Sequence, residues 1–258
     1  MHRARPTATA TGVARVAVVL ALCAAIVAGC STNKETSTLL VSVAASLEPA
    51  FQEIASDFET QVPGVVVDIN SGGSNSLAAQ IIEGAPVDVF ASANSEAMED
   101  VLYWHAATGP VQTFALNSVV IAVPPGNPAS VSGLEDFGNE NLFIGLCLPA
   151  VPCGSYARES LASAGVVASV DTEEPNVRSL TLKIESGEID AGIVYTSDVV
   201  AAAGSVDSIL IPDEHNVDVR YPIAVVSADE SGVAAAFVAF VMSDDGREIL
   251  ASFGFELP

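Results

Sequence analysis

Short apolar runs alternate with segments of helical spacing along nearly the whole chain after residue 38. The run at 39–43 is followed by residues 47–58, whose apolar positions recur with the period of a helix. The same alternation returns with apolar runs at 65–69 and 119–123, and it continues to a last run at 221–226. Regular alternation of strands and helices predicts an α/β fold with mainly parallel sheets.

Several of the expected strand-to-helix turns carry small or hydroxyl-bearing residues. Three turns are Ala44-Ala45-Ser46-Leu47, Ser71-Gly-Gly-Ser74-Asn75-Ser76 and Pro152-Cys153-Gly154-Ser155-Tyr156-Ala157, and a strand ends at Gly192-Ile-Val-Tyr195. We expect Ser46 to cap the helix at 47–58 and Asn176 to cap a helix at 177–186. The first turn of a helix has unpaired N–H groups and a partial positive charge, so several such turns aimed at one point form an anion site without a cation.

The first 29 residues have the features of a secretory signal. Three arginines precede an uncharged run of 14 residues at 16–29, which is shorter than the about 20 residues that a membrane-spanning helix needs. Small residues precede Cys30, as in a bacterial lipobox, where the cysteine is lipidated and becomes the first residue. Ordinary cleavage nearby, with a free thiol at Cys30, is the alternative. We expect a lipoprotein signal at 1–29 and a polar tether at 30–37.

The charge balance excludes several classes of partner. Cleavage after residue 29 removes three of the nine basic residues and no acidic one, so six basic residues remain against 32 acidic residues and the net charge is −26. Nucleic acid is not expected to bind, because phosphate contacts depend on basic side chains. The surface also repels anions at long range, so an anion site must act through short-range hydrogen bonds.

Two cysteines remain in the expected mature domain. Cys147 and Cys153 lie in the segment Cys-Leu-Pro-Ala-Val-Pro-Cys, and a disulfide is the usual state of such a pair in an exported protein. A metal-binding pair is the alternative, but no histidine lies nearby in the sequence.

Other polar residues have a structural interpretation as well as a functional one. We expect Arg158 and Arg178, beside the turns, to point away from the anion, and Asp88 and Asp190 to brace loops rather than bind metal. The two histidines beyond the expected signal, His105 and His215, have no serine or cysteine at a spacing typical of a catalytic triad.

Taken in order, the motifs resemble those of a known family, the molybdate-binding lipoproteins and periplasmic proteins that supply ABC transporters. The matching segments are Ala44–Leu47, Ser74–Ile81, Gly84–Phe90, Asn117-Ser118, Pro152–Ala157 and Gly187–Tyr195. Each segment alone is weak evidence, whereas the ordered set, which spans residues 38–258, is specific.

The resemblance implies a two-lobed periplasmic-binding-protein fold of type II. Each lobe is then a mainly parallel sheet flanked by helices, with the ligand held between the lobes. One lobe is expected at 38–117 plus 222–258 and the other at 118–221.

The resemblance also implies a ligand set. Ser46 and Ser74 match two serines that donate hydroxyl and backbone N–H bonds, and Tyr195 matches a tyrosine that donates its hydroxyl. Cys153 and Val177 match positions that donate a backbone N–H at a helix start. The cysteine at 153 departs from the small residue usual in the family, although only its backbone is needed there.

The implied function is capture of molybdate, and also tungstate, outside the cytoplasm and delivery to an ABC transporter permease. The metal is reached only through the oxygens of the oxyanion, and no cofactor or enzymatic activity is expected. We expect a monomer held by lipid at the outer face of the bacterial cell membrane. The alternatives are another oxyanion, such as sulfate or thiosulfate, or a serine hydrolase that uses Ser46 or Ser74.

Overall fold

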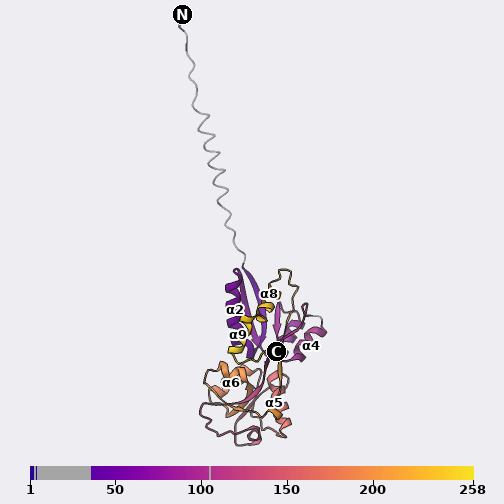
Figure 1. Cartoon of the computed structure of the whole chain (residues 1–258), viewed down its shortest axis with the longest axis vertical. Coiled ribbons are helices and arrows are strands. Elements are labelled where there is room, and N and C mark those ends of the chain that lie inside the picture. The colour runs from indigo at the N-terminus through magenta and orange to yellow at the C-terminus, as the bar shows by residue number, and fades with distance from the viewer. Residues whose placement is uncertain (3, 5–35, 105) are drawn as a thin grey trace. The chain divides into compact units, whose positions relative to one another are not determined.

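The computed structural model describes residues 1, 2, 4, 36–104 and 106–258, and one compact unit spans Ser37–Pro258 (Figure 1). The expected signal at 1–29, Cys30 and nearly all of the tether lie outside the described residues. No helix among the described residues has the length and apolar character needed to cross a bilayer.

The first sheet has five strands in the order β2-β1-β3-β10-β4. Their bounds are β1 Ser37–Ala44, β2 Val65–Gly72, β3 Val89–Ala91, β4 Gln112–Asn117 and β10 Val219–Val225. Strands β2, β1 and β3 pair in parallel, whereas β10 is antiparallel to both β3 and β4. Four of the five strands therefore run in one direction.

The second sheet repeats this plan with the order β7-β6-β8-β5-β9. Its strands are β5 Val119–Val123, β6 Ile144–Cys147, β7 Thr172–Glu174, β8 Ala191–Tyr195 and β9 Asp207–Leu210. Strand β5 is the antiparallel one and pairs with both β8 and β9. The chain passes from the first sheet to the second at Asn117–Val119 and returns in β10.

Helices cover both sheets, with α2, α8 and α9 around the first and α5 and α6 around the second (Figure 1). The α-helices are α2 Glu48–Gln61, α3 Ser74–Ile82, α4 Ser95–Tyr103, α5 Pro152–Ser163, α6 Val177–Glu185, α7 Thr196–Ala201, α8 Val233–Val241 and α9 Asp244–Ser252. Short 3-10 turns lie at Ala45–Leu47, Leu134–Gly138 and Asp213–His215.

The apolar face of α2 shows why the helical spacing produces this packing. Phe51, Ile54 and Phe58 are buried on one face of the helix. The rings of Phe51 and Phe58 contact Phe237 of α8, with centroids 6.2 Å and 5.2 Å apart. Buried aromatic pairs of this kind hold the two helices together, and Phe51 also contacts Phe114 of β4, with ring centroids 5.7 Å apart.

The α/β class and the two-sheet architecture are confirmed, while several local expectations change. Ser46 is not the N-cap of α2, because it lies inside the 3-10 turn and Leu47 occupies the cap. Helix α3 begins at Ser74, inside the turn expected at 71–76, so that turn is shorter than expected. The exact lobe boundaries stay a prediction; β10 begins at Val219, slightly before the boundary drawn at residue 222.

Candidate functional site

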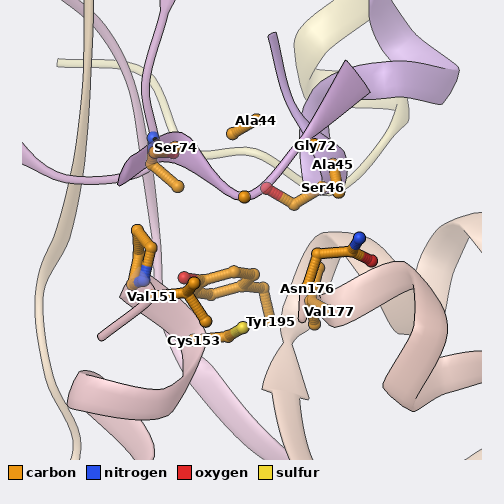
Figure 2. A pocket seen from close by; sticks show the side chains of 13 residues that line it. Ala44, Ala45, Ser46, Gly72, Ser74, Val151, Cys153, Asn176, Val177 and Tyr195 are labelled. Carbon is orange, nitrogen blue, oxygen red and sulfur yellow. Dashed lines mark hydrogen bonds between the residues drawn. The ribbon is translucent and has the colours of Figure 1, made fainter. Parts of the chain in front are cut away.

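A small pocket lies where the carboxyl ends of strands from both sheets meet. Figure 2 shows Ser46 and Ser74 on one side and Cys153, Val177 and Tyr195 on the other. The complete lining is Ala44, Ala45, Ser46, Gly72, Gly73, Ser74, Ala93, Val151, Pro152, Cys153, Asn176, Val177 and Tyr195. None of these thirteen residues has an ionisable side chain except Tyr195 and the disulfide-bonded Cys153, so the lining is electrically neutral at pH 7.

The first side of the pocket is built from the turns that follow β1 and β2. Ser46 lies in the 3-10 turn after β1 and is buried, and its Oγ is 3.1 Å from Tyr221 Oη. Ser74 is the first residue of α3, and its Oγ accepts a hydrogen bond from the N–H of Ala93 at 3.0 Å. Both hydroxyls are therefore held from behind by the fold.

The second side is formed by the first turns of α5 and α6. Cys153 is the second residue of α5, and Val177 is the first residue of α6. N–H groups at these positions have no acceptor within their own helix. Asn176 caps α6 as expected, because its side chain accepts the N–H of Ser179 at 2.9 Å. The pocket thus faces two positively polarised helix ends.

A disulfide and a close backbone approach hold the start of α5 in place. Cys147 and Cys153 are bonded, with their Cα atoms 5.7 Å apart. A Cβ added to Gly154 would lie only 1.9 Å from the carbonyl oxygen of Leu148, so only glycine fits there. Arg158 donates to the carbonyl of Cys147 at 2.8 Å and pairs with Glu173, which directs its guanidinium away from the pocket as expected.

Tyr195 contributes a buried hydroxyl to the pocket. The residue ends β8 and is 1% exposed, and its Oη has no hydrogen-bond partner among the described residues. Burial raises the pKa of Tyr195 well above its usual value, so the hydroxyl keeps its hydrogen. An unpaired hydroxyl in such a place costs about 1–3 kcal/mol unless a ligand accepts its hydrogen bond.

The two sides of the pocket approach each other closely. A Cβ added to Gly73 would lie 2.9 Å from the carbonyl oxygen of Pro175 on the opposite side, and 3.3 Å from a methyl carbon of Val151. The structure therefore brings all five expected ligand residues, Ser46, Ser74, Cys153, Val177 and Tyr195, into one small pocket. Their role as ligands stays a prediction.

Comparison with known proteins places this geometry in a family. A family profile described as bacterial extracellular solute-binding protein matches residues 39–256. The molybdate-binding protein ModA of Mycobacterium tuberculosis is 34% identical over 93% of this chain and 97% of its own length. The Escherichia coli ModA is 32% identical over 85% of this chain and 89% of its own length.

The chain belongs to the bacterial extracellular solute-binding proteins, in the group that includes these ModA proteins. A solved structure of the periplasmic molybdate-binding protein of Azotobacter vinelandii supports the fold, with a TM-score of 0.76 over 85% of this chain and 99% of that one, at 23% identity.

The other polar residues of this solute-binding protein serve the framework. Asp88 accepts the N–H of Leu40, and Asp190 accepts the N–H of Phe143, so both carboxylates brace loops as expected. His215 contacts an exposed serine on α5 and lies outside the pocket lining, and His105 lies outside the described residues. Within the described ranges, no three His, Cys, Asp or Glu side chains are placed to hold a metal ion.

Behind the pocket, sequence reasoning included Asn117 in a matching motif without giving it a role, and it missed Tyr221. Asn117 donates to Ser197 Oγ at 2.8 Å and to Tyr221 Oη at 3.4 Å. Tyr221 in turn contacts Ser46, although no motif pointed to it. The only signal in the sequence was its position beside the expected lobe boundary at residues 221 and 222. In the structure, the register of β10 shifts between Tyr221 and Pro222.

Asp198 of α7 should make stability depend on pH. Burial raises the pKa of its carboxyl from 3.8 to about 7, against the opposing effects of the Tyr195 N–H and Arg178. A raised folded-state pKa stabilises the protein below about pH 4, and this contribution is lost as the pH rises through 7. The amide oxygen of Asp198→Asn can still accept the Tyr195 N–H. We expect this variant to become more stable relative to wild type as the pH rises from about 4 to about 7. Denaturant unfolding from pH 4.5 to 8 measures it; a difference that stays constant with pH contradicts the assignment.

Proposed function

We propose that this protein captures molybdate between its two lobes and delivers it to an ABC transporter permease. The observation that carries the proposal is the buried, protonated and unpartnered hydroxyl of Tyr195 in an uncharged pocket. A ligand that accepts this hydrogen bond removes the cost of burying it. Relatives named as molybdate-binding proteins support molybdate as that acceptor.

The donor set favours an oxyanion over a cation or a neutral solute. Three hydroxyls, from Ser46, Ser74 and Tyr195, and the helix-start N–H groups of Cys153 and Val177 converge on one small volume. N–H groups only donate, and a tetrahedral oxyanion only accepts when it carries no proton. Neutral donors also fit a chain whose long-range field repels anions, because the attraction acts at contact.

Selection among dianions then depends on size and protonation. Sulfate is smaller than molybdate, so it leaves some donors unpaired, at about 1–3 kcal/mol for each one. Hydrogenphosphate brings a proton into a site made of donors. Tungstate has nearly the same size and charge as molybdate, and we propose that it binds as well.

The proposed activity is binding without chemistry. Ser46 Oγ lies beside Tyr221 Oη and Ser74 Oγ beside the Ala93 N–H, so each serine faces a group that cannot act as a general base at pH 7. This argues against the serine hydrolase that the sequence left open. We also propose that the protein acts as a monomer, with no cofactor.

Loss of one pocket hydroxyl should weaken binding of molybdate. We expect Ser46→Ala, Ser74→Ala and Tyr195→Phe each to raise the Kd for molybdate by about 5–150-fold, the equivalent of one lost hydrogen bond of about 1–3 kcal/mol. Titration calorimetry measures the effect.

Matched controls separate this effect from general disturbance. Tyr156→Phe removes a hydroxyl from a ring 6.5 Å from that of Tyr195, and Ser71→Ala changes an exposed serine at the end of β2, three residues before Ser74. Neither residue lines the pocket, and both variants should bind like wild type. Unchanged affinity in all three pocket variants, or sulfate bound as tightly as molybdate, would show that the proposed ligand is wrong.

We propose further that Cys30 is acylated and holds the protein at the outer face of the cell membrane. The support is the sequence before Cys30, with its arginines, its apolar run and its small residues. Lipid anchoring of this kind makes membrane attachment depend on one thiol. Cys30→Ala should move the protein from the membrane fraction to the soluble fraction of a producing bacterium, while Cys23→Ala should not. Equal membrane retention of both variants would contradict the anchor.

A further inference from the structure

The hydroxyl of Ser46 is connected to a chain of buried polar groups that leads away from the pocket. Ser46 Oγ and Tyr221 Oη lie 3.1 Å apart, and both side chains are buried. Either oxygen of such a pair can be the donor. The direction of this one bond decides whether the Ser46 hydrogen is free to point into the pocket.

The orientation of Asn117 settles the direction at the far end of the chain. The N–H of Ser118 donates to Asn117 Oδ1 at 2.9 Å, so that oxygen is identified by its donor. The amide nitrogen then faces Ser197 Oγ at 2.8 Å and Tyr221 Oη at 3.4 Å. An amide nitrogen only donates, so the Tyr221 oxygen accepts.

Among the described residues, the hydroxyl hydrogen of Tyr221 has one remaining acceptor. In the described part of the chain, Ser46 Oγ is the only other hydrogen-bond partner of Tyr221 Oη. Burial raises the pKa of Tyr221 far above its usual value, which keeps the hydroxyl protonated. Tyr221 therefore donates to Ser46, and the Ser46 hydrogen is left for the pocket.

The direction of the hydrogen bond at Ser74 Oγ is set in the same way, but by a backbone group. Its Oγ accepts the N–H of Ala93 at 3.0 Å, which leaves its own hydrogen to donate elsewhere. A backbone N–H cannot reverse its role, whereas the hydroxyl of Tyr221 can do so if Asn117 is lost. Of the two pocket serines, only Ser46 therefore has a hydrogen-bond direction that is set by other side chains.

We propose that Tyr221, oriented by Asn117, is a specificity-determining residue that forces the Ser46 hydroxyl to donate and so makes the pocket reject protonated oxyanions. This inference rests on the proposed function, because it assumes that an oxyanion occupies the pocket. Tyr221 acts through Ser46 and is a positioning residue. Chains of hydrogen bonds also strengthen one another, so the same arrangement makes Ser46 a better donor.

The test compares sulfate with hydrogenphosphate at pH 8, where both are dianions of similar size and differ in one proton. Competition against molybdate, followed by calorimetry, gives the affinity ratio for wild type and for Tyr221→Phe. We expect the variant to bind molybdate about 3–10-fold more weakly, as for one weakened hydrogen bond. We expect its preference for sulfate over hydrogenphosphate to fall by at least about 3-fold, because Ser46 becomes free to accept.

Three further variants distinguish an effect on the direction of the Ser46 hydrogen bond from a general disturbance of packing. In a Ser46→Ala background, Tyr221→Phe should leave the sulfate-to-hydrogenphosphate ratio unchanged. Asn117→Ala, which removes the donor to Tyr221, should lower the ratio as Tyr221→Phe does, and it serves if Tyr221→Phe fails to fold. Tyr156→Phe is the matched control and should keep the wild-type ratio. The ring of Tyr156 lies 6.5 Å from that of Tyr195, and the ring of Tyr221 lies 6.1 Å from it.

The outcomes separate the two proposals. A wild type that binds none of the three anions overturns both the proposed function and this inference. A wild type that binds molybdate, with an unchanged ratio in both Tyr221→Phe and Asn117→Ala, overturns the inference alone. A ratio that shifts equally with and without the Ser46 hydroxyl also overturns it, because the effect would then not pass through Ser46.

Discussion

Under the proposed function, the structure depends on one electrostatic constraint: a site for a buried dianion that is built without a cation must supply hydrogen-bond donors from every side. Helix starts and hydroxyls are the groups that can do so in a neutral lining. Two such turns come from each sheet, and they meet only because the strands that precede them end at the same place. The disulfide at Cys153 and the close approach at Gly154 then fix the start of α5 against β6.

The same constraint explains why the pocket is supported by a layer of buried polar groups. Ala93 stands behind Ser74, Tyr221 behind Ser46, and Asp198 accepts the backbone N–H of Tyr195 at 3.0 Å. The hydroxyl of Tyr195 itself has no hydrogen-bond partner in the part of the chain that the structure describes, at a cost of about 1–3 kcal/mol. Sites of function are where a fold departs from full satisfaction of its polar groups, and a bound acceptor would reverse that cost. The supporting layer therefore holds Ser46, Ser74 and Tyr195 in place from behind the pocket.

Strand–helix alternation and the small-residue turns were enough to predict the α/β class and most elements. The ordered motifs predicted all five residues that meet in the pocket. Strands β4 and β7 and helix α7 were missed. Three residues of strand and six of helix carry too little periodicity, and buried and exposed residues do not alternate along β4. Ser46 was placed at the cap of α2, although the chain makes a 3-10 turn first. The partners Tyr221 and Ala93 could not be found, since they lie 175 and 19 residues from the serines they contact.

The most direct test of this account is diffraction from a crystal grown with molybdate, with anomalous scattering used to locate the molybdenum. We expect one molybdenum position between Ser46 and Tyr195, with oxyanion oxygens about 2.5–3.2 Å from the Ser46, Ser74 and Tyr195 hydroxyls. We also expect the backbone nitrogens of Cys153 and Val177 to donate to the same ion. Molybdenum bound elsewhere, or in this pocket while the Tyr195 hydroxyl turns to a protein acceptor, would contradict the central claim.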